Sequence, residues 1–90
     1  MDIPPEQSLI QYPCDFPIKV MGAHVDGFAE ALVAVARQFD PGFDAASVAT
    51  RPSSGGKYLA VTLTIRATSR EQLDGIYRAL TGHPMVKVVL

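Results

Sequence analysis

The stretch "SSGGK" at residues 53–57 has part of the composition of a phosphate-binding loop. A complete nucleotide-binding P-loop follows a strand, opens a helix and places Ser or Thr directly after its lysine. Here Tyr58 follows the lysine, the first glycine of the motif is missing, and the segment joins two runs of strand-like alternation. We therefore predict a hairpin loop, in which glycine supplies positive backbone φ angles.

Few residues could support catalysis or metal binding. Ser53 and Ser54 are the candidate nucleophiles and a histidine could lie near them, but no carboxylate is placed to orient that histidine in a catalytic triad. The two histidines, His24 and His83, lack the cysteines or paired acidic motif of a metal site. We therefore expect a protein that is not an enzyme and that uses no cofactor and no metal.

Composition and charge narrow the class of protein. The chain has 90 residues, of which 48% are hydrophobic and 19% charged, as in one globular domain. A net charge of −1 gives no overall attraction to nucleic acid or to an acidic membrane. No apolar run approaches the ~18 residues of a membrane span, and residues 1–13 do not resemble a signal peptide. The single cysteine, Cys14, fits a reducing compartment, so we expect a cytoplasmic protein.

Apolar periodicity predicts six regular elements in one domain over residues 15–90, after an extended, proline-containing arm over residues 1–14. In order they are strand 15–22, helix 25–39, strand 45–52, strand 57–67, a helix that begins at 68–69 and is ended by residues 81–84, and strand 85–90. The second helix begins with a capping-box pattern, either Ser69 with Gln72 or Thr68 with Glu71.

The faces of these elements follow from the same periodicity. The first helix should bury Val25, Phe28, Leu32, Val35, Ala36 and Phe39. In the last strand, Val86, Val88 and Leu90 should share one face, and Lys87 and Val89 the other.

The order β-α-β-β-α-β predicts an α+β, ferredoxin-like fold. Two helices would cover one face of a four-stranded antiparallel sheet, because each helix must bury its apolar stripe. Right-handed crossovers give the strand order 4-1-3-2.

This topology brings three connections to one end of the molecule, namely residues 21–24, 51–57 and 82–84. We call this end the loop end. It would carry cations and histidines beside the start of the first helix, an arrangement that favours anions.

We hypothesise that the loop end binds a carboxylate or phosphate group of a small molecule, or an acidic partner segment. The alternative is that the loops are only solvated and that Asp26 satisfies the helix end. The predicted binding residues are Lys19, Met21, Gly22, Ala23, His24, Arg51, Ser53, Ser54, Gly56, Lys57, Tyr58 and His83.

The sheet face away from the helices is the second candidate surface. Its predicted residues are Lys19, Met21, Thr62, Thr64, Arg66, Lys87 and Val89. This face would be mildly basic, mixed with apolar groups and without an acid. RNA-recognition domains stack bases on aromatic residues of the central strands, and here only Tyr58 would be available, at one end. RNA binding is therefore disfavoured, whereas a second copy could pair with this face or the face could be solvated.

Four segments carry a resemblance to a known family: "FPIKVMG", the helix after it, "RPSSGGKYLAVTLTIRAT" and "VKVVL". Together they resemble the YbeD family of small bacterial cytoplasmic proteins, over residues 12–90 or so, most specifically at residues 19–22 and 52–58. The resemblance implies an ACT-like version of the ferredoxin fold and an association with lipoate metabolism. ACT domains bind small ligands, typically amino acids, at the loop after the first strand, which is residues 21–24 here. They usually regulate an attached enzyme, and this chain has none.

We therefore expect a non-catalytic regulatory or ligand-sensing domain that acts in trans and binds a small anionic ligand at the loop end. A link to lipoate metabolism is implied by the resemblance alone. The alternative is a protein–protein interaction module with no small-molecule ligand. The expected partner is an unidentified protein or a small carboxylate, a homodimer is left open, and neither nucleic acid nor membrane is expected.

Overall fold

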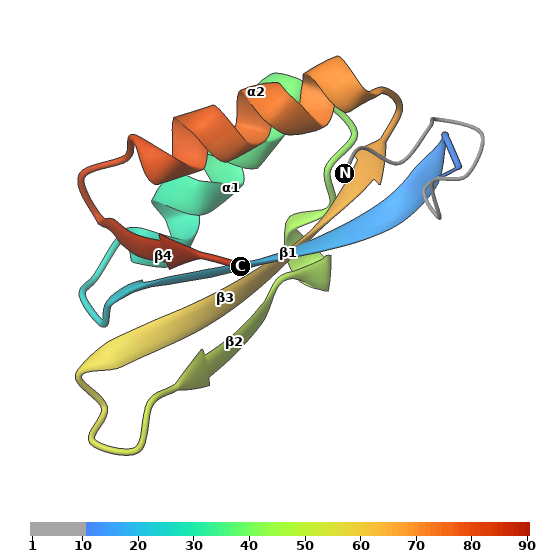
Figure 1. Cartoon of the computed structure of the whole chain (residues 1–90). Coiled ribbons are helices and arrows are strands. Elements are labelled where there is room, and N and C mark those ends of the chain that lie inside the picture. The colour runs from blue at the N-terminus through green and yellow to red at the C-terminus, as the bar shows by residue number, and fades with distance from the viewer. Residues whose placement is uncertain (1–10) are drawn as a thin grey trace.

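The computed structural model describes residues 11–90, and two helices lie on one face of a four-stranded antiparallel sheet (Figure 1). The elements are β1 (Cys14–Ala23), α1 (Phe28–Phe39), the 3-10 helix η2 (Ala45–Ser47), β2 (Ala49–Pro52), β3 (Tyr58–Ala67), α2 (Arg70–Thr81) and β4 (Val86–Val89). The order β2-β3-β1-β4 is 4-1-3-2 counted from the opposite edge, so the predicted ferredoxin-like α+β fold is confirmed. Residues 1–10 of the predicted arm lie outside the described residues, and Cys14 already belongs to β1.

The core lies between the helices and the two central strands, β1 and β3. Every second residue of β3 is buried, as is every second residue of β1 from Ile18 onward, because successive side chains of a strand point to opposite faces. The helices contribute residues at three- and four-residue steps. The largest fully buried side chains are Phe28, Ile18, Leu32, Leu63, Ile65, Ile76, Leu80, Val20 and Val61. Phe43, in the connection after α1, also joins the core and was not predicted from the pattern.

One glutamine joins three elements at the end of the sheet opposite the loop end. Ser69 is the N-cap of α2, and its Oγ accepts from the backbone N–H of Gln72 at 3.1 Å, as the capping-box pattern predicts. The Gln72 side chain reaches one residue further back than the box requires, since its Oε1 accepts from Thr68 N at 2.7 Å. Its Nε2 donates to Phe39 O at 2.8 Å and to Arg66 O at 3.1 Å. A single side chain thus links the ends of α1 and β3 to the start of α2.

Two predicted boundaries are wrong because local capping decides them. The predicted strand 45–52 is a strand only over Ala49–Pro52, since Asp44 Oδ1 accepts from Ala46 N at 2.9 Å and caps the turn η2. The first helix begins at Phe28 rather than at Val25, because its N-cap Gly27 has a φ of 87°. Val25 therefore lies outside the buried stripe and is 51% exposed.

The predicted faces of β4 are also wrong, because β4 carries a bulge against β1. Val89 pairs with Val20 and Val88 with Met21, but the next β1 residue, Gly22, pairs with Val86. The extra residue shifts the alternation by one position. Val88 consequently lies on the open face and is 45% exposed, whereas Val89 packs against the core.

Neither of the two α-helices in the part of the chain that the structure describes has the length and apolar character needed to cross a membrane.

Gly22 lies buried where β1 meets α1 and the segment before β4. A Cβ atom at this position would lie 2.5 Å from Phe28 Cζ and would overlap the carbonyl oxygen of Met85. The strand therefore requires glycine here, not for its φ angle but for the close approach of its neighbours.

We predict that Gly22→Ala lowers the free energy of unfolding by roughly 1–3 kcal/mol, because the backbone and a core aromatic ring must move. Chemical denaturation followed by circular dichroism measures this change. Gly55→Ala is the matched control, since nothing lies within 4 Å of its Cβ position and its φ is not positive. Equal stability of the two variants would contradict the close-approach argument.

Candidate functional site

His24 connects the β1–α1 loop to the β2–β3 hairpin through two hydrogen bonds. Its backbone N–H donates to Lys57 O at 3.0 Å, and its ring Nδ1 donates to Gly56 O at 3.1 Å. Two of the three connections predicted to meet at the loop end are therefore directly bonded, and they lie side by side in Figure 1.

The stretch "SSGGK" forms the loop of the β2–β3 hairpin, as predicted. Ser53 N donates to Tyr58 O at 2.8 Å, and Ser53 Oγ accepts from Tyr58 N at 3.0 Å. Gly56 N donates to Ser53 O at 2.8 Å, with a φ of 74° at Gly56. The Ser53 hydroxyl thus holds the hairpin closed, while Ser54 is exposed at its tip.

The third connection is held by His83. Its Nδ1 accepts from Met85 N at 3.1 Å, and its carbonyl accepts from Val86 N at 3.1 Å. The contact of Met85 with Gly22 brings this turn against the end of β1. Both histidines of the chain therefore hold loops in place. Over residues 11–90, no group of three or more His, Cys, Asp or Glu side chains is arranged to hold a metal ion.

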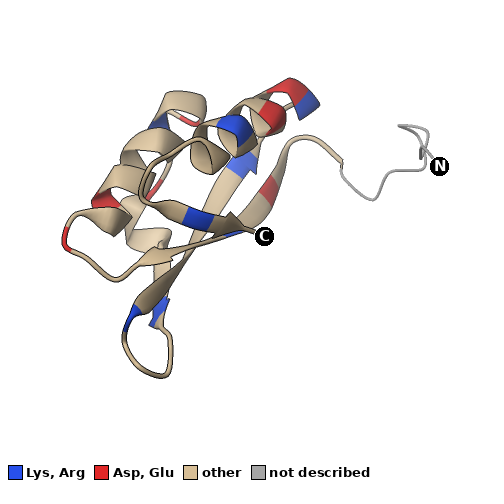
Figure 2. Cartoon of the chain, turned by 60° about the vertical axis from the view of Figure 1, so that its left-hand side comes forward, with Lys and Arg blue, Asp and Glu red and all other residues tan. Residues whose placement is uncertain are grey.

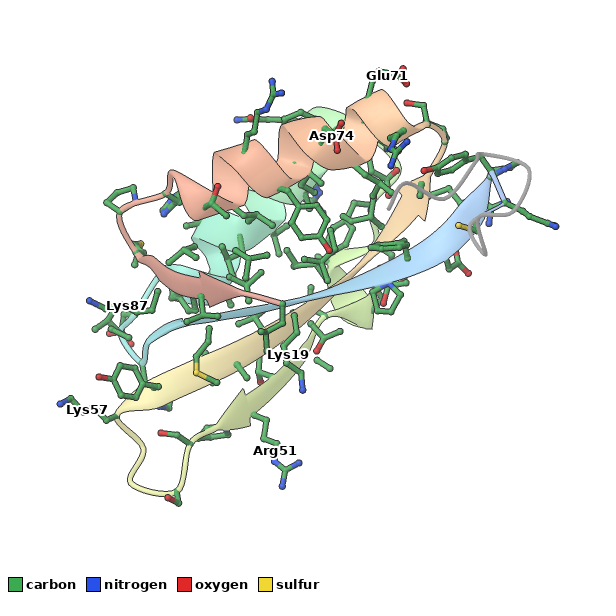
Figure 3. The ribbon with its side chains drawn as sticks, viewed as in Figure 1. Lys19, Arg51, Lys57, Glu71, Asp74 and Lys87 are labelled. Atoms are coloured by element: carbon green, nitrogen blue, oxygen red, sulfur yellow. The ribbon has the colours of Figure 1, made fainter. Side chains whose placement is uncertain are left out.

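Four cations lie at the loop end or on the adjacent part of the sheet. We call them the basic set: Lys19, Arg51, Lys57 and Lys87. Figure 3 shows Lys57 and Lys87 at the loop end, and Lys19 and Arg51 projecting from the sheet away from the helices. Lys57 Nζ lies 5.6 Å from the centroid of the Tyr58 ring, a cation–π geometry. Among the described residues none of these four forms a salt bridge.

The one salt bridge among residues 11–90 lies at the other end of the open face. Arg66 Nη1 is 3.3 Å from Asp15 Oδ1, and the two residues are paired across β1 and β3. The prediction that this face carries no acid is therefore wrong, but its acid is matched with a cation away from the basic set. Carboxylates elsewhere in the described chain are carried largely by the helices and by loops beside them (Figure 2).

The start of α1 is not satisfied by Asp26, contrary to the alternative considered from the sequence. The N-cap residue is Gly27 and no side chain caps this end of the helix. Asp26 is exposed in the turn before it.

The described surface includes two shallow grooves that differ in charge. One, of about 350 Å³, lies on the open face of the sheet and is lined by Lys19, Ala49, Thr50, Arg51, Ala60 and Thr62. The other, of about 440 Å³, lies between α1 and residues 45–48 and is lined by Ala29, Glu30, Val33, Ala34, Arg37, Ala45 and Val48. The first contains two cations and no acid, whereas the second contains one of each. The groove on the sheet, which we call the sheet groove, is therefore the one that favours an anion.

The structure divides the predicted binding residues into two groups. The loop end holds Gly22, Ala23, His24, Ser53, Ser54, Gly56, Lys57 and His83. The open face holds Lys19, Met21, Arg51 and Tyr58. The sequence did not indicate that Ala49 and Ala60 form the sheet groove, because their position in adjacent rows of the sheet depends on strand register.

We predict that His24→Ala makes the amides of His24 and Gly56 exchange faster, because the ring bond to the hairpin is lost. The free energy of unfolding should fall by only about 1 kcal/mol, the usual net value of one such bond. Amide hydrogen exchange followed by NMR measures both effects. His83→Ala is the control and should instead affect Met85; unchanged exchange at the hairpin in His24→Ala would contradict the role of the ring.

Sequence comparison places the chain among uncharacterised bacterial proteins. Residues 7–90 match the family described as "Protein of unknown function (DUF493)". A UPF0250 protein of Bordetella pertussis is 67% identical over 89 residues, covering 99% of this chain and 98% of its own. A UPF0250 protein of Leptothrix cholodnii is 65% identical with the same coverage.

Structure comparison agrees on the fold. The solution structure of protein HP0495 from H. pylori superposes with a TM-score of 0.76, covering 100% of this chain and 97% of the other, at 15% sequence identity. At that identity the likeness concerns the fold alone.

Proposed function

The chain belongs to the DUF493 family, which agrees with its resemblance to YbeD, and from this premise we propose that it is a non-catalytic regulatory or ligand-sensing domain that binds a small anionic ligand. The observation that carries the proposal is the basic set. Lys19, Arg51 and Lys57 lie on one half of the molecule and none of them is paired with a carboxylate among the described residues. An anion is the ligand that such a surface attracts.

The absence of a catalytic role is part of this proposal. Ser53, the better placed of the two candidate nucleophiles, uses its hydroxyl to accept from Tyr58 N. His24, the histidine nearest the hairpin, directs its ring nitrogen to Gly56 O. A general base must instead be within reach of the proton that it removes from its nucleophile. Both side chains are better explained as parts of the loop structure.

The size of the relatives supports the proposal of action in trans. The chain spans 98% of the length of the Bordetella and Leptothrix proteins, so these relatives carry no attached enzyme. A regulatory domain of this kind would act on a separate protein. The link to lipoate metabolism is carried only by the resemblance to the YbeD family, and it makes lipoate and octanoate useful test ligands.

We predict saturable amide shifts when the ¹⁵N-labelled protein is titrated with a panel of lipoate, octanoate, amino acids and inorganic phosphate. The shifts should fall in residues 19–24 and 49–62. The double variant Arg51→Gln/Lys57→Gln should weaken binding by about tenfold or more, as expected when charge-assisted hydrogen bonds are lost. Arg78→Gln, an exposed cation on α2, is the matched control and should bind normally. Undiminished binding by the double variant would exclude the basic set as the site.

A protein-interaction module is the second candidate, favoured by the exposure of the hairpin. All four residues of the edge strand β2 are exposed, and the β2–β3 hairpin projects beyond the helices (Figure 1). An exposed edge strand presents unpaired backbone groups to a partner.

This alternative predicts a flat response to the whole ligand panel, together with capture of a bacterial protein by a photo-crosslinker placed at Ser54. A crosslinker at Glu71, exposed on α2, is the control position. Capture of the same proteins from both positions would contradict a role for the hairpin.

A further inference from the structure

We propose that the sheet groove is a binding site for a small dianion, a phosphate monoester or a dicarboxylate, held between Lys19 and Arg51. This inference rests on the proposed function and narrows it in two ways. It places the ligand on the open face of the sheet rather than among the loops, and it requires two negative charges rather than one.

Strand register builds the groove from two rows of residues on the open face. Lys19, Thr62 and Ala49 lie opposite one another across β1, β3 and β2. The next row toward the hairpin is Met21, Ala60 and Arg51. The two alanines leave a hollow between long side chains, and the half-buried Thr62 lies between the cations with a hydroxyl that can donate to an anion.

The two cations stand at diagonal corners of this hollow. From the spacing of strands and residues, their Cα atoms are separated by roughly 12 Å, two strands across and two residues along. Figure 3 shows both side chains on the side of the sheet away from the helices. Arg51 can bind a carboxylate or phosphate through two parallel hydrogen bonds, while Lys19 adds a point charge from the other side.

The charge balance of the groove favours a dianion. Its lining includes two cations and no carboxylate. The acid on the same strand as Lys19, Asp15, is paired with Arg66 at the far end of the sheet and does not neutralise the groove. A monoanion would leave one of the two cations unmatched, whereas a dianion matches both.

The shape of the groove disfavours a long apolar ligand. The groove is shallow, and its apolar lining consists chiefly of two alanines. It has no aromatic or branched aliphatic wall against which an eight-carbon chain could lose its contact with water. Recognition should therefore depend on the charged groups of the ligand, and octanoate or lipoate should bind poorly here.

Binding in the groove would connect the edge strand to the centre of the sheet. Lys19 belongs to β1 and Arg51 to β2, with β3 between them. A ligand that contacts both would bridge β3 and restrain β2, whose residues are all exposed. Occupancy would thus be transmitted to the hairpin as slower local opening.

The test is an amide NMR titration at low ionic strength with inorganic phosphate, succinate and octanoate as separate probes. We expect phosphate or succinate to give saturable shifts at residues 19, 49–51 and 60–62, and to slow amide exchange in β2.

Lys19→Gln and Arg51→Gln should each weaken binding by about tenfold. Arg78→Gln, the matched cation control outside the groove, should change it by less than about twofold, and Lys57→Gln tests the alternative site among the loops. All four side chains are exposed, so the spectra of the variants should retain the native dispersion.

The outcomes separate this inference from the function that it rests on. A response to phosphate alone assigns a phosphoryl ligand, and a response to succinate alone assigns a dicarboxylate. Octanoate binding in the groove as tightly as either would overturn the requirement for a dianion. Binding that is lost in Lys57→Gln but kept in Lys19→Gln would move the site to the loops, leaving the proposed function intact. No response to any probe or to the wider panel would overturn both.

Discussion

The close contact at Gly22 is the constraint on which the loop end depends. Because this residue has no side chain, the Phe28 ring and the Met85 carbonyl both pack directly on the end of β1. The first turn of α1 and the segment before β4 are thereby held against the same strand. Two residues later, His24 bonds the hairpin between β2 and β3. Three connections that are distant in sequence are thus held together by one glycine and one histidine.

The two ends of the sheet are stabilised in different ways. At the far end Gln72 satisfies backbone groups of three elements, Asp40 Oδ2 accepts from Arg66 N at 3.0 Å, and Arg66 pairs with Asp15. Arg66, Asp40 and Gln72 are thus matched there within the chain. In the half nearer the hairpin, the polar loop residues also bond to backbone, but the long cations do not find carboxylates among the described residues. The basic set therefore lies in the half of the molecule nearer the hairpin without a carboxylate partner among the described residues.

The sequence was sufficient to predict the fold but not every boundary, for identifiable physical reasons. Alternation in β1 and β3 is strong because one face of each is buried, and it correctly predicted which residues form the core. The faces of β4 were predicted wrongly because the bulge opposite Gly22 is set by packing against β1, which the alternation within β4 does not reveal. The 3-10 turn at Ala45–Ser47 depends on one capping carboxylate, that of Asp44, which competes with a weak strand pattern.

The candidate site was predictable only in part, because residue type and residue position contribute differently to it. Lys19, Arg51 and Lys57 could be predicted from the sequence because they carry charge. The hollow between Lys19 and Arg51 is formed by the small side chains of Ala49 and Ala60. These methyl groups carry no charge or hydrogen-bonding atom, and they contribute only because strand register places them in adjacent rows. Conversely, Ser53, His24 and His83 use polar side-chain atoms to hold turns. These three side chains are thus engaged in the loop structure, whereas the long cations of the basic set have no carboxylate partner among the described residues. This division of roles is the reason that we propose binding rather than catalysis.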